Sequence, residues 1–176
     1  MIIGHGDIAG ALIDRPDLCF FAAGVSNSNE HRWEEFQRER DLLYAQTPSK
    51  HLVYFSSLCM FYSYTEYAAH KRVMEMRVVE RFPVHHTIIR LGNITWGTNP
   101  HTLINHLRAC HAAGLPLDVQ DVWRYVVDLD EFRHWMALIP DWSCEMNVPG
   151  RRMKVADIVR EFVLPQWHHL GERAYV

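Results

Sequence analysis

The chain opens on a short apolar stretch that runs directly into a glycine-rich turn. Met1-Ile2-Ile3 is followed by Gly4-His5-Gly6-Asp7-Ile8-Ala9, a GxGxxA pattern that leads into a helical stretch ending near Ile13. Glycines at such a turn let the backbone bend tightly, and they let a pyrophosphate approach the N–H groups at the start of a helix. The order of strand, turn and helix therefore predicts the first unit of a nucleotide-binding α/β fold. Its candidate cofactor-binding residues are Gly4, Gly6, Asp7, Ile8 and Ala9.

Apolar runs and helical patterns alternate along the rest of the chain. We expect strands at residues 1–3, 18–23, 51–56, 86–91 and 117–119. We expect helices at residues 7–13, 30–46, 102–113, 129–139 and 155–163, and a further helix that carries Tyr67 and ends near residue 82. Strands that alternate with helices predict an α/β fold with a parallel sheet and crossover helices. In the second helix, Trp33, Phe36, Leu43 and Tyr44 are expected to form the inner face.

A tyrosine and a lysine stand four residues apart in the middle of the chain. In a helix, Tyr67 and Lys71 lie on one face, one turn apart. The lysine charge can then lower the phenol pKa from its ordinary value of about 10, so that the phenol exchanges a proton with a carbinol or carbonyl oxygen near neutral pH. Ser57, which follows the apolar run 51–55, can hold the same oxygen by a hydrogen bond. The candidate catalytic residues are therefore Ser57, Tyr67 and Lys71, with His70 expected to point away from them into solvent.

Six segments in order resemble the extended short-chain dehydrogenase/reductase family, in its sugar-nucleotide epimerase/dehydratase branch. They are Gly4-His5-Gly6-Asp7-Ile8-Ala9, Phe20-Phe21-Ala22-Ala23-Gly24, Leu52-Val53-Tyr54-Phe55-Ser56-Ser57, Tyr67-Ala68-Ala69-His70-Lys71, Arg90-Leu91-Gly92-Asn93-Ile94-Thr95-Trp96-Gly97 and Trp123-Arg124-Tyr125-Val126-Val127-Asp128-Leu129. Together they cover most of the chain.

The resemblance implies a Rossmann-like fold, NAD or NADP as cofactor, and a nucleotide sugar or a related carbonyl or alcohol as substrate. It leaves epimerisation, dehydration and reduction open. By this resemblance Tyr67 is the general acid/base, Lys71 also holds the nicotinamide ribose, and Ser57 orients the substrate oxygen. The other implied site residues are Ala22, Ala23 and Gly24 beside the cofactor, and Asn93 and Arg124 beside the substrate. Residues 98–176 would be a reduced substrate-side portion of one Rossmann-like domain spanning 1–176.

One part of the family pattern is missing from this chain. Residues 20–24 already resemble the family's fourth strand and its loop, yet they follow the first helix almost at once. The strand 2–3 region is therefore absent, together with the acidic residue that holds the adenosine ribose about 20 residues after the glycines, so we expect weak cofactor binding. The first strand would be left as an open edge. We expect a homodimer or larger homo-oligomer that covers this side, with the first helix and the region of Trp33 and Phe36 as contact surfaces.

Charge and residue usage argue against several other classes of partner. The net charge of −3 gives no electrostatic case for nucleic acid or an anionic membrane. No apolar run reaches the roughly 20 residues of a transmembrane helix, and no signal-peptide pattern is present, so we expect a cytoplasmic protein. The 4 cysteines are widely spaced and fit reduced thiols. The 12 histidines show no zinc-ligand spacing, so we expect no metal site.

Simpler readings of the same residues stay open. Tyr67 and Lys71 can be ordinary helix-surface residues, Ser57 can cap a turn, the first glycines can form a turn without a ligand, and Asn93 can satisfy loop backbone groups. On these readings the chain is a non-catalytic binding or regulatory relative that has lost productive cofactor binding. A third reading is a subunit that completes the site of a partner.

Overall fold

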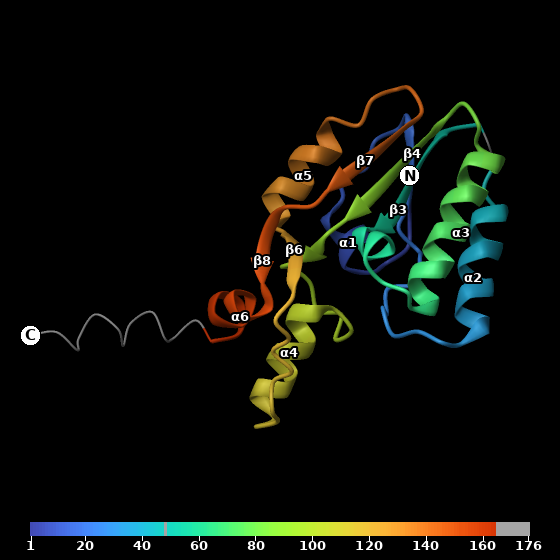
Figure 1. Cartoon of the computed structure of the whole chain (residues 1–176). Helices are drawn as coiled ribbons and strands as arrows, with labels where there is room; N and C mark the ends of the chain where they lie inside the picture. The colour runs from blue at the N-terminus through green and yellow to red at the C-terminus, as the bar shows by residue number, and fades with distance from the viewer. Residues whose placement is uncertain (48, 165–176) are drawn as a thin grey trace, which may run out of the picture.

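The computed structural model describes residues 1–47 and 49–164, and its main element is a parallel sheet (Figure 1). The sheet has five strands in the order β1-β2-β3-β4-β7. Their bounds are β1 Ile2–Ile3, β2 Leu18–Phe21, β3 His51–Ser57, β4 His86–Leu91 and β7 Cys144–Val148. β2 is buried along its whole length, and all but the last residue of β3 are buried, as expected for parallel strands that are covered on both faces. The predicted α/β class with a parallel sheet is confirmed.

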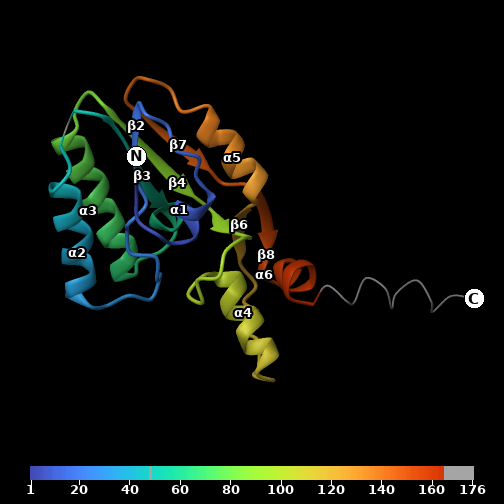
Figure 2. The same cartoon turned by 180° about the vertical axis from the view of Figure 1, so that it is seen from behind.

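Helices cover both faces of this sheet, as the two opposite views show (Figure 1 and Figure 2). α1 (Asp7–Ala11) and α5 (Leu129–Ala137) pack with Phe20 and Phe55 on one face. α2 (Trp33–Tyr44) and α3 (Glu66–Arg81) pack with Phe21 and Tyr54 on the other. α3 and α5 begin at side-chain caps, because Thr65 accepts a hydrogen bond from the Ala68 N–H and Asp128 accepts one from the Glu131 N–H.

A smaller unit lies beyond the carboxyl end of the sheet. It has a three-stranded sheet in the order β5-β6-β8, with bounds β5 Asn93–Ile94, β6 Trp123–Val127 and β8 Arg151–Lys154. α4 (Leu103–Ala112) and α6 (Val155–Ile158) pack against it through Ile104 and Ile158, and the π-helical turn η2 (Val159–Val163) packs with Leu107 of α4. A 3-10 turn, η1 (Leu58–Phe61), directly follows β3.

Several element boundaries differ from the sequence-based expectations. The expected strand at 117–119 is absent, and that segment has no regular structure. β6, β7 and β8 were not expected as strands, because their exposed polar residues interrupt the apolar runs that mark the central strands. α2 begins at Trp33, and only Phe36 and Leu43 of its expected inner face are buried. Trp33 and Tyr44 are 65% and 39% exposed. In a helix of 3.6 residues per turn they lie roughly a quarter turn away from the buried Phe36 and Leu43.

The connections through α1 and α2 have opposite hands. β1, β2, β3 and β4 are parallel neighbours in chain order, so each crossover moves in the same direction across the sheet. α1 nevertheless packs on the face opposite to α2 and α3. Crossovers that run in the same direction over opposite faces have opposite hands. One of the two connections therefore departs from the rule that nearly all such crossovers are right-handed.

β1 forms one edge of the sheet. The Met1 and Ile3 carbonyls accept hydrogen bonds from the Phe20 and Ala22 N–H groups of the β2 segment, at 2.9 and 2.8 Å. The N–H and C=O of Ile2 therefore face away from β2, and no other strand of the described residues pairs with them. The open edge is as expected, although it presents the peptide groups of a single residue. The homo-oligomer through this side stays a prediction.

A buried histidine at the amino end of β3, His51, is expected to make stability depend on pH. His51 is 8% exposed, its Nε2 lies 2.8 Å from the Thr87 hydroxyl, and its Nδ1 has no hydrogen-bond partner among the described residues. Burial, with a smaller contribution from His85 and His86, lowers the pKa of His51 below its usual value. The folded state thus favours the neutral ring, so this stabilisation is complete above the unfolded-state pKa and is lost as pH falls below it.

We expect urea unfolding to show a stability loss between pH 7 and pH 5 that is smaller in His51→Gln than in the wild type. His101→Gln, at an exposed position, serves as the control and should keep the wild-type dependence. Equal pH dependence in all three proteins would contradict the assignment to His51.

Candidate functional site

The predicted catalytic and cofactor-binding residues come from the carboxyl edge of the parallel sheet. Ser57 ends β3 beside Leu91, the last residue of β4. The glycine turn follows β1, and Ala22 to Gly24 follow β2. Tyr67 and Lys71 lie in the first half of α3, which starts after η1. Because parallel strands end at the same edge, segments far apart in the sequence meet there.

The turn after β1 is closely packed. Gly4 has φ +115°, and a Cβ at this position would lie 2.4 Å from the Ala22 carbonyl oxygen, so only glycine fits. Gly6 precedes α1 and has open space around it. The Asp7 carboxylate accepts hydrogen bonds from the Thr98 and Asn99 N–H groups at 3.0 and 2.9 Å. Asp7 thus ties this turn to the smaller unit.

The Lys71 ammonium is fully engaged within the protein. It donates to Glu39 Oε1 at 2.9 Å, to the Tyr54 hydroxyl at 3.2 Å and to the Phe55 carbonyl at 3.4 Å. Lys71 is 2% exposed. An ammonium group has three N–H donors, and three acceptors surround this one. No donor is left for a cofactor ribose in this arrangement.

Glu39 of α2 is the centre of this cluster, and the sequence analysis did not identify it. Its carboxylate is completely buried. It also accepts hydrogen bonds from the Val25 N–H at 2.8 Å and from the Tyr54 hydroxyl at 2.6 Å. Burial raises the pKa of Glu39, but the Lys71 charge and the hydrogen bonds more than offset this and hold the pKa below its usual range. A signal was available, because Glu39 lies three residues after Phe36 and four before Leu43, within the apolar stripe of its helix.

His70 does not point into solvent, so that expectation is wrong. Its Nε2 lies 2.9 Å from Glu39 Oε2, and its side chain is 10% exposed. Its ring stacks on Phe36, with 4.5 Å between the ring centroids. The buried carboxylate of α2 draws the imidazole inward.

Tyr67 is buried, and its electrostatic environment contradicts the expected lowering of its pKa. The ring packs against Val25, Phe36 and Cys59, and the Lys71 Nζ lies 5.7 Å from its centroid. Burial raises the pKa of the phenol, and Cys59 and Glu39 raise it further. Lys71 does not reverse the shift, because its charge is balanced by Glu39. Phe36, expected as a contact surface for another copy, instead covers Tyr67.

Ser57 lies beside Tyr67 and also caps the next turn. Its hydroxyl accepts a hydrogen bond from the Cys59 N–H at 3.2 Å. Its interaction with the phenol lowers the pKa of Tyr67 and so opposes part of the effect of burial. The structure therefore brings Ser57, Tyr67 and Lys71 into one cluster and shows Ser57 as a turn cap, while its role in orienting a substrate oxygen stays a prediction.

A groove of about 490 Å³ begins at Leu58, the residue that follows Ser57. It lies between η1 and the β6–β8 sheet, and its lining includes Phe61, Tyr62, Trp123, Tyr125, Asn147 and Arg152. The Arg152 guanidinium lies 4.5 Å from the Trp123 ring centroid, and Arg124 lies 5.6 Å from that of Tyr62. Asn93, also expected at the substrate, donates to the Tyr125 carbonyl at 2.9 Å. Among these residues, the sequence analysis identified only Arg124 and Asn93.

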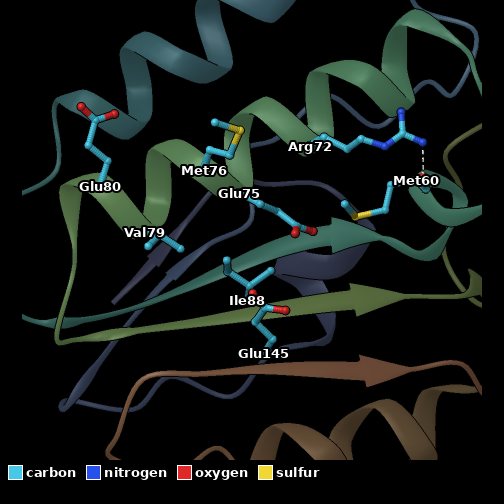
Figure 3. A pocket seen from close by; sticks show the side chains of 8 residues that line it. All are labelled: Met60, Arg72, Glu75, Met76, Val79, Glu80, Ile88 and Glu145. Atoms are coloured by element: carbon cyan, nitrogen blue, oxygen red, sulfur yellow. Dashed lines mark hydrogen bonds between the residues drawn. The ribbon is translucent and has the colours of Figure 1, made fainter.

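A second groove, of about 520 Å³, runs along the outer side of α3 (Figure 3). Its charges are already paired: Arg90 lies 2.6 Å from Glu75 and 2.7 Å from Glu145. Arg72 donates to the Met60 and Ser63 carbonyls. Glu80, which also lines the groove, is exposed and lies 3.9 Å from Arg77. The buried charges of this groove are thus engaged within the protein, so the site is assigned to the carboxyl edge.

Two general findings concern the described residues as a whole. Within 1–47 and 49–164, no three histidine, cysteine, aspartate or glutamate residues are grouped as metal ligands would be. In the same residues each helix is too short or too polar to cross a bilayer.

The fold and the loops at its carboxyl edge define a Rossmann-like α/β protein. No family model matches the chain, and no curated protein sequence is similar to it. Solved structures do share its fold, at low identity. A dTDP-glucose 4,6-dehydratase from Streptomyces venezuelae, DesIV, with NAD and DAU bound, is similar at 17% identity with a TM-score of 0.63. That match covers 86% of this chain and 57% of the dehydratase.

Two further structures show the same partial coverage. A UDP-glucuronic acid 4-epimerase from Bacillus cereus, in complex with UDP-glucuronic acid and NAD, matches at 16% identity and a TM-score of 0.62, over 83% of this chain and 58% of the epimerase. The Bordetella bronchiseptica enzyme WbmG, in complex with NAD, matches at 16% identity and a TM-score of 0.60, over 90% of this chain and 57% of WbmG. The chain thus spans little more than half the length of these enzymes.

Proposed function

We propose that this chain is a shortened NAD(P)-dependent oxidoreductase, epimerase or dehydratase that acts on a nucleotide sugar or a related carbonyl or alcohol. The observation that carries the proposal is the meeting of three predicted parts at one sheet edge. These parts are the glycine turn after β1, the loop after β2, and the cluster of Ser57, Tyr67 and Lys71. Solved structures of the same fold contain NAD and UDP-sugars, which supports the same ligand class here.

The residues present suit the pyrophosphate of such a cofactor better than its nicotinamide ribose. Open space remains around Gly6, whereas Lys71 must give up one of its acceptors before it can bind a ribose hydroxyl. A bound nicotinamide would accept and return a hydride. In this proposal Ser57 orients the substrate oxygen, and Tyr67 donates a proton to it or removes one.

The groove beside Ser57 fits the nucleotide part of the substrate. Aromatic rings stack on bases regardless of their identity, and guanidinium groups pair with phosphates. The side chains of Trp123 and Tyr62 offer the first kind of contact, and those of Arg124 and Arg152 the second. We therefore place the nucleotide in this groove and the sugar toward Ser57.

Calorimetric titration tests this placement. We expect UDP and dTDP to bind, and Trp123→Ala to weaken binding by roughly five- to a hundredfold, because stacking on an aromatic ring contributes about 1–3 kcal/mol per base. Trp142→Ala is the matched control, since Trp142 is 65% exposed and outside the groove lining. Unchanged affinity in Trp123→Ala would contradict the placement. Titrations with NAD, NADH, NADP and NADPH in the same series are expected to show weak binding.

One observation favours a second function, a non-catalytic Rossmann-like protein that binds a nucleotide or regulates a partner. All three donors of Lys71 are taken up inside the protein, and the adenosine-side segment is missing. Nucleotide binding without turnover of dTDP- or UDP-sugars in the presence of NAD would establish this second function. A cytoplasmic location and a single domain with a reduced substrate-side portion at 98–176 remain predictions.

A further inference from the structure

The buried cluster around Lys71 has one member that the proposed reaction does not use. Glu39, on α2, accepts hydrogen bonds from four groups on three other segments: the Val25 N–H, Tyr54 of β3, and His70 and Lys71 of α3. An exposed glutamate on a helix is solvated by water and does not require several hydrogen-bond donors from the protein. The carboxylate is completely buried, and removing a charge from water is costly unless it is paired.

The pair between Glu39 and Lys71 is the shortest contact of the ammonium. The Nζ lies 2.9 Å from Glu39, against 3.2 Å from Tyr54 and 3.4 Å from Phe55. Gly24 closes the space above it, because a Cβ there would lie 2.8 Å from Nζ and 2.9 Å from Glu39 Oε1. The positive charge that the site needs beside Tyr67 is therefore balanced and enclosed.

We propose that Glu39 is a positioning residue that holds Lys71 in a closed ion pair and thereby controls whether the lysine acts on Tyr67 and on a ligand. The proposal rests on the proposed function only for its meaning in catalysis, since the pair itself is tested without cofactor. In the closed state the phenol faces no net positive charge. A ligand hydroxyl that reaches Lys71 must replace Tyr54 or Phe55, the two more distant acceptors.

Several groups besides Lys71 act on the phenol of Tyr67. They are Ser57 at the end of β3, Cys59 of η1, Tyr62 after η1, and Glu39 of α2. Val25 and Phe36 supply the apolar walls. Of these groups Glu39 alone is a carboxylate, and its neutralisation leaves the Lys71 charge unbalanced beside the phenol.

Amine acylation measures the closed pair directly, because the chain has three lysines, Lys50, Lys71 and Lys154. With acetic anhydride and mass spectrometry of the peptides, Lys50 and Lys154 should react in the folded wild type while Lys71 stays protected. In Glu39→Gln, acylation of Lys71 should rise roughly ten- to a hundredfold, the range expected for a lost charge-assisted hydrogen bond. Glu35→Gln, on the same helix one turn earlier, should leave Lys71 as protected as in the wild type.

A second readout follows the phenol instead of the amine. Tyrosinate absorbance is titrated in Glu39→Gln and in Glu39→Gln/Tyr67→Phe, and the difference between them reports Tyr67 alone. We expect Tyr67 to ionise at lower pH than in the same subtraction made on the wild type and Tyr67→Phe. A merely structural role of Glu39 would not move this difference.

Two results would overturn the proposal: Lys71 equally protected in Glu39→Gln and the wild type, or Lys71 already reactive in the wild type. If Glu39→Gln does not fold, Glu39→Gln/Lys71→Met decides, because the double change leaves no unpaired buried charge. A folded double variant supports the pair, and an unfolded one contradicts it. All these measurements use the protein without cofactor, so they can succeed even where turnover, and with it the proposed function, fails.

Discussion

Lys71→Met is expected to lower the free energy of unfolding by about 3–5 kcal/mol, the usual loss when one partner of a buried ion pair is removed. Methionine keeps most of the length of the side chain but provides no charge. Glu39 would then lie completely buried with only the hydrogen bonds from Val25, Tyr54 and His70. The Val25 N–H and the Tyr54 hydroxyl are neutral donors, so they satisfy the carboxylate oxygens without balancing the negative charge.

Urea unfolding followed by circular dichroism measures this loss. Lys50→Met is the control, because Lys50 is exposed and its replacement should change stability by no more than about 0.5 kcal/mol. A Lys71→Met protein as stable as Lys50→Met would show that Glu39 and Lys71 are not a closed pair in solution. Lys71 would then have an N–H donor free for a ligand, as its predicted catalytic role requires.

Tyr67→Phe is expected to reduce turnover of a nucleotide sugar by roughly 10²–10⁴-fold, the usual contribution of a positioned general acid or base. The variant removes the hydroxyl and keeps the ring that packs against Val25 and Phe36, so the fold should be retained. Because burial, Cys59 and Glu39 raise the pKa of Tyr67, the phenol holds its proton at neutral pH. It therefore serves first as the acid, which donates a proton to a carbonyl oxygen.

Steady-state assays with dTDP- and UDP-sugars in the presence of NAD or NADP test this role. Tyr64→Phe is the matched control, because Tyr64 is 99% exposed and the same atom is removed. Undiminished turnover in Tyr67→Phe would exclude the phenol as the proton donor. Loss of turnover with unchanged nucleotide affinity would separate its chemical role from binding.

Four of the five strands of the central sheet could be predicted from the sequence because they are short apolar runs. Residues 51–56 and 86–91 fall within β3 and β4, and the turn at Gly4 is where the first strand pattern ends. β7 and β8 escaped prediction because they are half exposed and carry charges such as Glu145 and Arg151. For such short strands, pairing with a neighbour outweighs local preference.

The pairing of Tyr67 with Lys71 was predictable from the sequence, but the electrostatics of the cluster were not. A spacing of four residues places Tyr67 and Lys71 on one helix face, as the structure has them, with 5.7 Å between the Nζ and the ring centroid. Nothing local to this motif shows that a carboxylate 32 residues earlier in the chain reaches the same ammonium. Spacing along one helix therefore identified the pair of residues, while the charge that acts on the phenol depends on a second helix.

The position of α1 has a consequence for where a ligand can enter. Doubly wound sheets open a crevice at the switch point, where two adjacent strands send their chains to opposite faces. Had the first two crossovers of this chain the same hand, α1 and α2 would share a face, and no switch point would lie between β1 and β2. Because α1 stays on the opposite face, β1 and β2 still diverge at their carboxyl ends. The described sheet thus has no strand beyond β1, yet its chain still diverges to opposite faces after β1 and β2, the arrangement at which doubly wound sheets bind ligands.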